Sequence, residues 1–211
     1  MKKSSYEGEY LLNIDPKPLL LVLSGPSGAG KDAVLTRLKE MGFPLEFIVT
    51  ITTRPRRNSE KDNIDYHFVS GESFQKMVEA KELLEWAKVY GNWYGVPRQP
   101  VKQTLAEGRD TILKVDIQGA ATIKKILPQA VFIFLMPLSK EDLVTRLRER
   151  NSESASDLDL RLRTVEEEME KLPIFDYAIV NKHGQIDQVI SEIKAIITAE
   201  KLRVAPREYC L

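Results

Sequence analysis

The sequence has little cysteine and histidine and no long hydrophobic run. Its 211 residues include one cysteine, Cys210, and two histidines, His67 and His183. A single cysteine excludes a disulfide framework within the chain, and these three residues provide no zinc-binding set. The apolar run at residues 19–23 is five residues long, whereas a membrane-spanning helix needs about 20. The composition therefore argues against a disulfide-rich, zinc-binding or membrane-spanning protein.

Neither sign of charge predominates, because 31 Lys and Arg residues face 31 Asp and Glu residues. This balance argues against a protein that coats nucleic acid, and we expect no nucleic-acid partner. The first 18 residues are polar, contain Pro16 and Pro18, and have no signal-peptide apolar stretch. Residues 1–18 are therefore interpreted as a flexible leader. In the absence of targeting signals we expect a cytoplasmic location and no membrane contact.

Strand-like apolar runs alternate with helical patterns along the chain. The length and the 43% hydrophobic content are typical of about one globular domain. Strands are predicted over residues 19–24, 47–52, 65–70, 111–115, 131–136 and 177–180, and helices over residues 31–41, 72–81, 119–127, 139–150, 158–171 and 186–202. This alternation predicts an α/β fold with a parallel sheet and helices on both faces. The strand-rich residues 50–98 interrupt it, which indicates an inserted lobe.

A glycine-rich turn follows the first predicted strand and matches the phosphate-binding pattern G-x-x-x-x-G-K. Glycines let successive backbone N–H groups point at a phosphate, and the following helix N-terminus adds partial positive charge. Lys31 would reach the β- and γ-phosphates of a nucleotide. The alternative is an ordinary strand-to-helix turn. The predicted phosphate-binding residues are Gly25, Pro26, Ser27, Gly28, Ala29, Gly30 and Lys31.

The residue after Lys31 departs from this pattern. A Ser or Thr at that place provides a hydroxyl ligand for Mg²⁺, whereas this chain has Asp32. A carboxylate also binds Mg²⁺, but it adds negative charge beside a polyphosphate, and the helix N-terminus offsets only about 0.3–1 kcal/mol of that repulsion. Asp32 therefore either binds the metal directly or is neutralised by another cation.

A basic turn and an aromatic stretch follow within the predicted lobe. Arg54 and Arg57 lie on a proline-containing turn, where two guanidinium groups can bind a dianionic phosphate. The alternative is a solvated basic loop. Residues 83–97 are rich in turns and aromatic residues, namely Trp86, Tyr90, Trp93 and Tyr94, which indicates strands that line a site. Glu85 can accept two N–H donors from a guanine edge, although alone it is more typical of a core or surface residue.

Taken together, these motifs resemble the guanylate kinase family, whose members transfer a phosphoryl group from ATP to GMP. The phosphate-binding loop is followed in order by TTRxxR at 52–57, DYxF at 65–68, EW at 85–86, GNxYG at 91–95 and DxQG at 116–119. The resemblance covers about residues 19–202. It implies a P-loop NTPase-like core (residues 19–49, 99–140 and 162–211), a GMP-binding lobe (50–98) and a helical lid (141–161). ATP and GMP are the implied substrates and Mg²⁺, bound with ATP, the implied cofactor; the oligomeric state is left open.

The resemblance also implies roles for individual residues. The GMP phosphate would be held by Arg54, Arg57, Tyr66 and Tyr94, and the guanine would lie near Thr50, Glu85 and Asp116. Asn181 would lie near the adenine of ATP, and Asp32 is the candidate contact to the metal. The implied catalytic residues are Lys31, Arg54, Arg57 and the lid arginines Arg146, Arg150 and Arg161. Arginines that arrive when a lid closes can stabilise charge on the transferring phosphoryl group; the alternative is a salt-bridged surface hairpin.

Three positions depart from the family pattern. Asp32 replaces the P-loop hydroxyl, Lys114 stands where an acidic residue is usual, and Val96 stands where a hydroxyl contacts the base. We expect Lys114 and Asp32 to form an ion pair near the phosphates, within about 4 Å of each other; the alternative is two unrelated changes. Loss of the hydroxyl at Val96 is expected to weaken base discrimination by about 0.5–1.5 kcal/mol.

Two other functions fit parts of the pattern. One is a guanylate-kinase-like binding module that has lost catalysis and binds phosphopeptides in the GMP lobe, which Asp32 favours and the arginines of the lid oppose. The other is a related kinase for a sugar phosphate, which Glu85 and Tyr94 oppose. Transfer from ATP to GMP is the function that the sequence favours.

Overall fold

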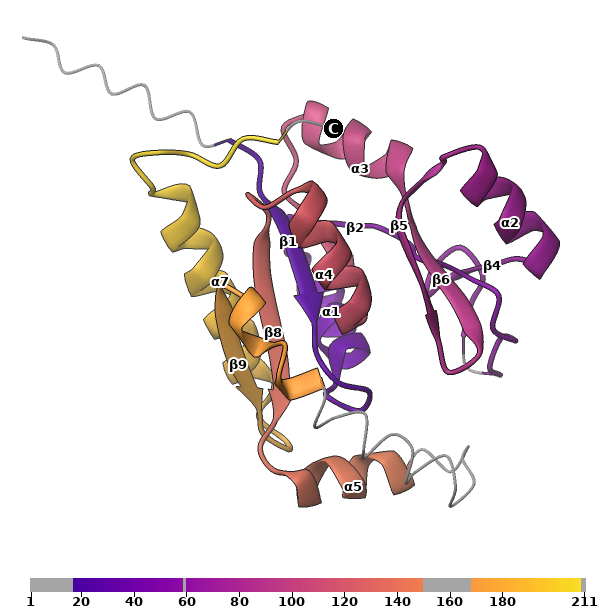
Figure 1. Ribbon diagram of the computed structural model, residues 1–211. Coiled ribbons are helices and arrows are strands. Elements are labelled where there is room, and N and C mark those ends of the chain that lie inside the picture. The colour runs from indigo at the N-terminus through magenta and orange to yellow at the C-terminus, as the bar shows by residue number, and fades with distance from the viewer. Residues whose placement is uncertain (1–16, 59, 150–167, 210–211) are drawn as a thin grey trace, which may run out of the picture.

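The computed structural model describes residues 17–58, 60–149 and 168–209, and these form two sheets with helices around them (Figure 1). The core sheet has five parallel strands in the order β2-β7-β1-β8-β9. Its strands are β1 (Leu20–Ser24), β2 (Glu46–Phe47), β7 (Thr111–Lys114), β8 (Val131–Pro137) and β9 (Tyr177–Asn181). The helices are α1 (Lys31–Glu40), α2 (Gly71–Glu79), α3 (Arg98–Ala106), α4 (Ile117–Ile126), α5 (Lys140–Glu149) and α7 (Ile186–Lys201), with a short 3-10 helix at Leu172–Ile174.

Helices cover both faces of the core sheet, which explains why β1 is a continuous apolar run. Leu21 and Leu23 pack with α1 and α7 on one face, whereas Leu20 and Val22 pack with α3 and α4 on the other. Successive side chains of a strand point to opposite faces, so every residue of β1 is buried. The predicted α/β fold with a parallel sheet and helices on both faces is confirmed.

The second sheet lies beside the core sheet (Figure 1) and has the strand order β4-β3-β6-β5. Its strands are β3 (Ile51–Thr52), β4 (His67–Phe68), β5 (Leu83–Val89) and β6 (Asn92–Pro97). It has a small apolar core of Ile51, Phe74 and Leu83. All of its strands fall within residues 50–98, the segment predicted to form an inserted lobe.

The single strand predicted over residues 47–52 is wrong. The chain pairs with β7 up to Ile48, whose N–H donates to the carbonyl of Ile112, and then leaves the core sheet. From Thr50, whose carbonyl accepts from the N–H of His67, it pairs within the second sheet. The apolar pattern continues through the crossing, so it does not reveal the change of partner. Helix α3 was not predicted, because Pro100 in its first turn masks the helical pattern.

Helix α5 begins as predicted. The Oγ of Ser139 accepts from the N–H of Asp142 at 3.2 Å, and the Asp142 carboxylate accepts from the N–H of Leu138 at 3.2 Å.

Some predicted segments lie outside the described residues. They are residues 1–16 of the leader, the remainder of the predicted lid after α5, and the second predicted lid helix up to residue 167. In the described part of the chain, no helix has the length and apolar character needed to cross a membrane.

Candidate active site

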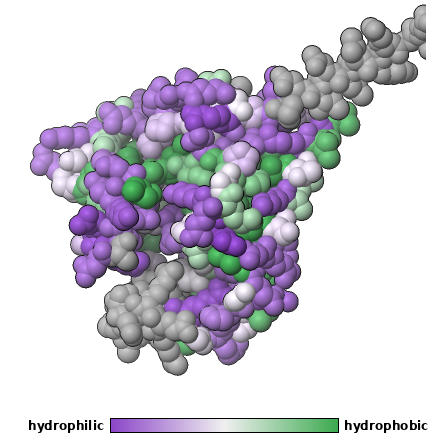
Figure 2. Space-filling model, turned by 180° about the vertical axis from the view of Figure 1, so that it is seen from behind, coloured by the Kyte–Doolittle hydropathy of each residue, from purple (hydrophilic) through white to green (hydrophobic). Residues whose placement is uncertain are grey.

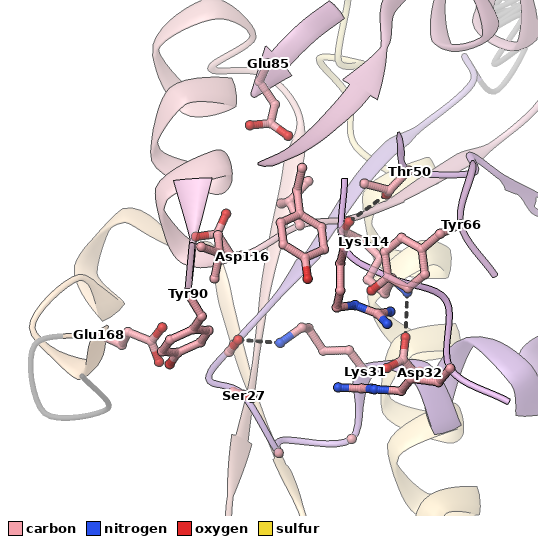
Figure 3. A pocket seen from close by; sticks show the side chains of 18 residues that line it. Ser27, Lys31, Asp32, Thr50, Tyr66, Glu85, Tyr90, Lys114, Asp116 and Glu168 are labelled. Atoms are coloured by element: carbon pink, nitrogen blue, oxygen red, sulfur yellow. Dashed lines mark hydrogen bonds and ion pairs between the residues drawn. The ribbon is translucent and has the colours of Figure 1, made fainter. Parts of the chain in front are cut away.

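A pocket lies where the carboxyl ends of the core strands meet the second sheet (Figure 3). Ligands of open α/β sheets commonly bind at this edge. Seen from behind, the molecular surface is mostly hydrophilic, with hydrophobic residues gathered toward the recessed middle of that face (Figure 2). The pocket is lined by Gly25, Ser27, Gly28, Gly30, Lys31, Asp32, Thr50, Arg54, Arg57, Tyr66, Glu85, Val89, Tyr90, Tyr94, Lys114, Val115, Asp116 and Glu168.

The glycine-rich turn forms one end of the pocket. Gly25 has φ +144°, and a Cβ on it would lie 2.0 Å from the carbonyl oxygen of Leu135, so no side chain fits there. The Lys31 ammonium donates to the carbonyl oxygen of Gly25 at 2.5 Å (Figure 3). It also donates to the carbonyl oxygen of Pro26 at 3.0 Å. Burial lowers the pKa of Lys31, although Asp32 beside it acts in the opposite direction. The turn thus combines backbone N–H groups, a helix N-terminus and an ammonium, as a polyphosphate requires.

Two residues predicted to contact ATP support the back of this turn instead of lining the pocket. The Asn181 amide donates to the carbonyl of Ala29 at 2.8 Å. Arg146 donates to the carbonyl of Asn181 at 2.5 Å and pairs with Asp142 at 2.9 Å. The contacts of Asn181 and Arg146 with ATP therefore stay predictions. Pro26 and Ala29, two further residues of the glycine-rich turn, do not line the pocket either. Arg150 and Arg161 lie outside the described residues.

A basic and aromatic cluster forms the side of the pocket that belongs to the second sheet. Arg54 donates to both carboxylate oxygens of Glu60, at 2.8 and 3.1 Å, and the N–H of Arg57 donates to the same carboxylate at 2.9 Å. Arg54 lies over the ring of Tyr66, with 5.4 Å between the guanidinium carbon and the ring centroid. The rings of Tyr66 and Tyr94 lie edge to face with centroids 6.0 Å apart. The two predicted phosphate-binding arginines and both tyrosines are therefore brought together.

Glu60 was not predicted. It accepts hydrogen bonds from both terminal nitrogens of Arg54 and so fixes the orientation of the guanidinium. Because a guanidinium has five N–H donors, others are left for a phosphate. Burial acts to raise the pKa of Glu60, but the hydrogen bonds from Arg54 and from the Arg57 backbone hold that pKa below its usual value. The only signal in the sequence is a carboxylate three residues beyond Arg57.

Glu85 and Asp116 bring two carboxyl groups to the other end of the pocket (Figure 3). Glu85 is 5% exposed, and in the described part of the chain its Oε2 has no hydrogen-bond partner. Burial, with a further contribution from Asp116, raises the pKa of Glu85 to about 8. Asp116 caps helix α4 by accepting from the N–H groups of Gly119 at 3.0 Å and Gln118 at 3.3 Å. A buried acceptor with an unused oxygen is suited to the paired N–H donors of guanine.

Gly119 makes room for the Glu85 carboxyl. A Cβ at this position would lie 2.8 Å from Oε2 of Glu85 and 3.1 Å from Oδ1 of Asp116. Thr50, also expected near the base, lines the pocket and donates to the carbonyl of Lys114 at 3.2 Å. Helix α4 therefore approaches the second sheet closely at the place where the base is predicted to bind.

The expected ion pair is confirmed, since the Lys114 ammonium lies 2.5 Å from Oδ1 of Asp32 (Figure 3).

The expectation that a missing hydroxyl at Val96 weakens base discrimination does not fit the structure. Val96 is 1% exposed, packs in the apolar cluster with Val101 and Val115, and does not line the pocket. A hydroxyl at this position would face the core, so its absence removes no contact with the base in this arrangement.

The aromatic stretch contributes to the pocket in part. Tyr90 and Tyr94 line it, whereas Trp86 and Trp93 pack on each other outside it with ring centroids 5.3 Å apart. Glu168 also lines the pocket and was not predicted. It is the last of three consecutive glutamates, and nothing in the local pattern distinguishes it from the other two.

Comparisons with known proteins agree with this geometry. The family model described as guanylate kinase matches residues 17–200. The chain is 47% identical over 193 residues to "Guanylate kinase 2, chloroplastic/mitochondrial" of Oryza sativa subsp. japonica, covering 91% of this chain and 68% of the relative. It is 40% identical over 193 residues to a guanylate kinase of Caldanaerobacter subterraneus subsp. tengcongensis, covering 92% and 93%.

The fold of this chain is also similar to that of a solved guanylate kinase. The crystal structure of guanylate kinase from Anaplasma phagocytophilum is similar to this chain with a TM-score of 0.74 and 33% identity. The similarity covers 90% of this chain and 89% of the solved one. The order of motifs, the two-sided pocket and these similarities lead to one assignment: the chain belongs to the guanylate kinase family.

Proposed function

We infer that this chain is a phosphotransferase that moves the γ-phosphoryl group of ATP to GMP, giving ADP and GDP. The observation that carries this function is that one pocket holds the glycine-rich turn with Lys31 at one side and Arg54 and Arg57 at another. Two anionic nucleotides bound to these groups would meet with their phosphates facing each other. The buried carboxyl of Glu85 provides the acceptor that selects guanine.

Positioning and charge stabilisation account for the catalysis in this proposal. The glycine-rich turn and Lys31 bind the phosphates of ATP, and the Arg54, Arg57, Tyr66 and Tyr94 side chains bind the phosphate of GMP. Phosphoryl transfer depends mainly on in-line placement and on cations near the equatorial oxygens. The attacking phosphate oxygen is already anionic, so no side chain has to remove a proton. Asp116 therefore acts through its charge and by capping α4.

Mg²⁺ enters this proposal as part of the MgATP substrate, where it neutralises phosphate charge. In the described residues, no group of three or more His, Cys, Asp or Glu side chains is arranged to hold a metal ion. Mg²⁺ in nucleotide sites is held largely by phosphates and water, with one or two carboxylates. The Asp32 carboxylate is chemically suited to such a contact, but its Oδ1 is occupied by Lys114. The phosphates of ATP would therefore supply most of the ligands.

A coupled assay of ADP release tests the proposed function with GMP, dGMP, AMP and ribose phosphate as acceptors. We expect turnover with GMP and at least about tenfold lower kcat/KM with AMP, because AMP cannot donate two N–H groups to Glu85. Absence of turnover with GMP over a range of Mg²⁺ concentrations, together with phosphopeptide binding, would favour the binding module. Preferential turnover of the sugar phosphate would favour the other kinase.

Arg56 provides a matched control for this assay, because it lies on the same turn as Arg57 but does not line the pocket. Arg57→Ala should raise the KM for GMP by at least about tenfold, as expected for a lost charge-assisted hydrogen bond. Arg56→Ala should leave that KM within about twofold. Equal effects of the two substitutions would contradict a specific phosphate site at Arg57.

The cellular location and the other partners belong to the same proposal. A cytoplasmic location stays a prediction, and the relative from Oryza sativa is named as a chloroplastic/mitochondrial protein. ATP and GMP are the proposed substrates, and the expectations of no nucleic-acid partner and no membrane contact stay predictions.

A further inference from the structure

Lys114 places a cation between the two sides of the pocket. It is the last residue of β7, and its side chain is 11% exposed. Its ammonium lies 2.5 Å from Oδ1 of Asp32, the second residue of α1, and 3.9 Å from the ring centroid of Tyr66, which directly precedes β4 of the second sheet. Figure 3 shows the three side chains grouped beside the glycine-rich turn. Lys114 therefore contacts one residue on the side of ATP and one on the side of the GMP phosphate.

The ion pair alone is a weak reason to bury this ammonium. Asp32 has a side chain that is 58% exposed, and ion pairs that reach solvent contribute little to stability, whereas removing an ammonium from water is costly. Burial acts to lower the pKa of Lys114, but Tyr66 and Asp32 beside it raise that pKa above its usual value, so the side chain stays charged. A charge kept in a pocket against this penalty is suited to an anionic ligand.

Four cationic side chains line the pocket, together with the carboxyl groups of Asp32, Glu85, Asp116 and Glu168. Lys31, Arg54, Arg57 and Lys114 all line it, and Lys114 is one of the groups that act to lower the pKa of Lys31, after the larger effect of burial. An ammonium has three N–H donors, and that of Lys114 hydrogen-bonds to Asp32 and to the Tyr66 hydroxyl. Its third N–H group can donate to a phosphate oxygen.

We propose that Lys114 binds the phosphate of GMP from the side that faces the glycine-rich turn, and that Asp32 and Tyr66 position its ammonium. The inference rests on the proposed function, because it takes the phosphate site at Arg54, Arg57, Tyr66 and Tyr94 as its starting point. The alternative is that Lys114 only neutralises Asp32, so that the pair has no contact with the substrate.

Calorimetric titration with GMP and with guanosine, without ATP or Mg²⁺, separates the two cases. Lys114→Met should weaken GMP binding about 10- to 100-fold, the effect of a lost charge-assisted hydrogen bond, and leave guanosine binding unchanged. The double variant Asp32→Ser/Lys114→Met should show the same loss, because it has no unpaired carboxylate to repel the phosphate. Asp32→Ser alone removes one of the two positioning contacts but keeps the ammonium, so it should lose less GMP affinity than Lys114→Met.

Lys124 supplies a matched control, since its ammonium lies 3.1 Å from Asp176 and 4.3 Å from the ring centroid of Phe132, outside the pocket. Lys124→Met should not change GMP binding, and thermal unfolding monitors the fold of every variant. If Lys114→Met does not fold, Lys114→Gln is titrated in its place.

GMP binding by the double variant that equals that of the original chain would overturn the proposal, and so would equal losses for GMP and guanosine. Turnover of ATP and GMP by the unsubstituted chain is measured separately. A chain without turnover that still loses GMP affinity on Lys114→Met would disprove the proposed function and leave this inference standing.

Discussion

Among single residues, Glu85 combines burial, a neighbouring carboxylate and an oxygen without a hydrogen-bond partner in the described part of the chain. Burial, and secondarily the charge of Asp116, raise its pKa to about 8 from a usual value of 4.5. Between these two pH values the folded chain holds a proton that the unfolded chain has released. The stability linked to this group is therefore complete below about pH 4.5 and is lost as the pH rises toward 8.

The resulting pH dependence is a prediction about Glu85→Gln. The free energy of unfolding of the original chain should fall relative to that of the variant by up to ~1.4 kcal/mol per pH unit between pH 5 and 8. GMP affinity of the original chain should rise over the same range, since the ionised carboxylate is the stronger acceptor, while the variant binds GMP weakly at every pH. Urea unfolding and calorimetry at pH 5, 6.5 and 8 measure both quantities. Parallel pH profiles of the two chains would contradict this assignment.

At the scale of elements, the packing of β5 against α4 decides where the Glu85 carboxyl lies. Gly119→Ala would place a Cβ 2.8 Å from the Glu85 Oε2, so the carboxyl has to move. We expect about a 10-fold or greater loss of GMP affinity, while the free energy of unfolding changes by no more than about 1 kcal/mol, because Ala favours a helix over Gly. Titration with GMP and urea unfolding provide the two readouts.

Gly71→Ala is the control for that substitution. Gly71 is the first residue of α2, and a Cβ there would meet no atom within 4 Å. The control should bind GMP normally. A Gly119→Ala chain with unchanged GMP affinity would show that the close approach of α4 does not matter for base recognition.

At the scale of the whole molecule, the segment after α7 returns to the core sheet and is held there by a buried ion pair. Arg207 donates to Glu200 at 2.7 and 2.8 Å and to the carbonyl of Ala130 at 3.1 Å. The Tyr209 hydroxyl accepts from the N–H of Leu20 at the start of β1. The hydrogen bonds from Arg207 contribute most to holding the pKa of Glu200 below its usual value. This contact joins the end of the described chain to the central strand, far from the pocket.

Arg207→Met should lower the free energy of unfolding by about 1–3 kcal/mol, because the buried Glu200 carboxylate loses the hydrogen bonds from Arg207. It keeps a hydrogen bond from the Tyr177 hydroxyl at 2.7 Å and an ion pair with Arg203 at 3.7 Å. The KM for GMP should not change, since neither Arg207 nor Glu200 lines the pocket. Urea unfolding and the coupled assay test these expectations together. The double variant Glu200→Met/Arg207→Met should recover most of the lost stability, and a double variant as unstable as the single one would refute the buried-pair explanation.

The sequence by itself determined the parts of this protein that depend on neighbouring residues. The alternation of strands and helices, the glycine-rich turn before α1 and the cap at Ser139 are local patterns, and each has its physical cause within a few residues of the chain. The same holds for the motifs around Arg54 and Glu85, whose order indicated the family before the fold was known. The pairing of Lys114 with Asp32 could be expected only because both positions depart from that family pattern.

Tertiary structure alone decided which side chains meet. It divided residues 47–52 between two sheets and turned Val96 into the core. It also placed Glu168 at the pocket and brought Gly119 against Glu85. These outcomes depend on contacts between residues far apart in the chain, where hydrophobic periodicity is the same for either arrangement. The pocket exists because the carboxyl ends of the core strands and the second sheet come together. These parts belong to separate segments of the chain, so no local sequence pattern predicts their contact.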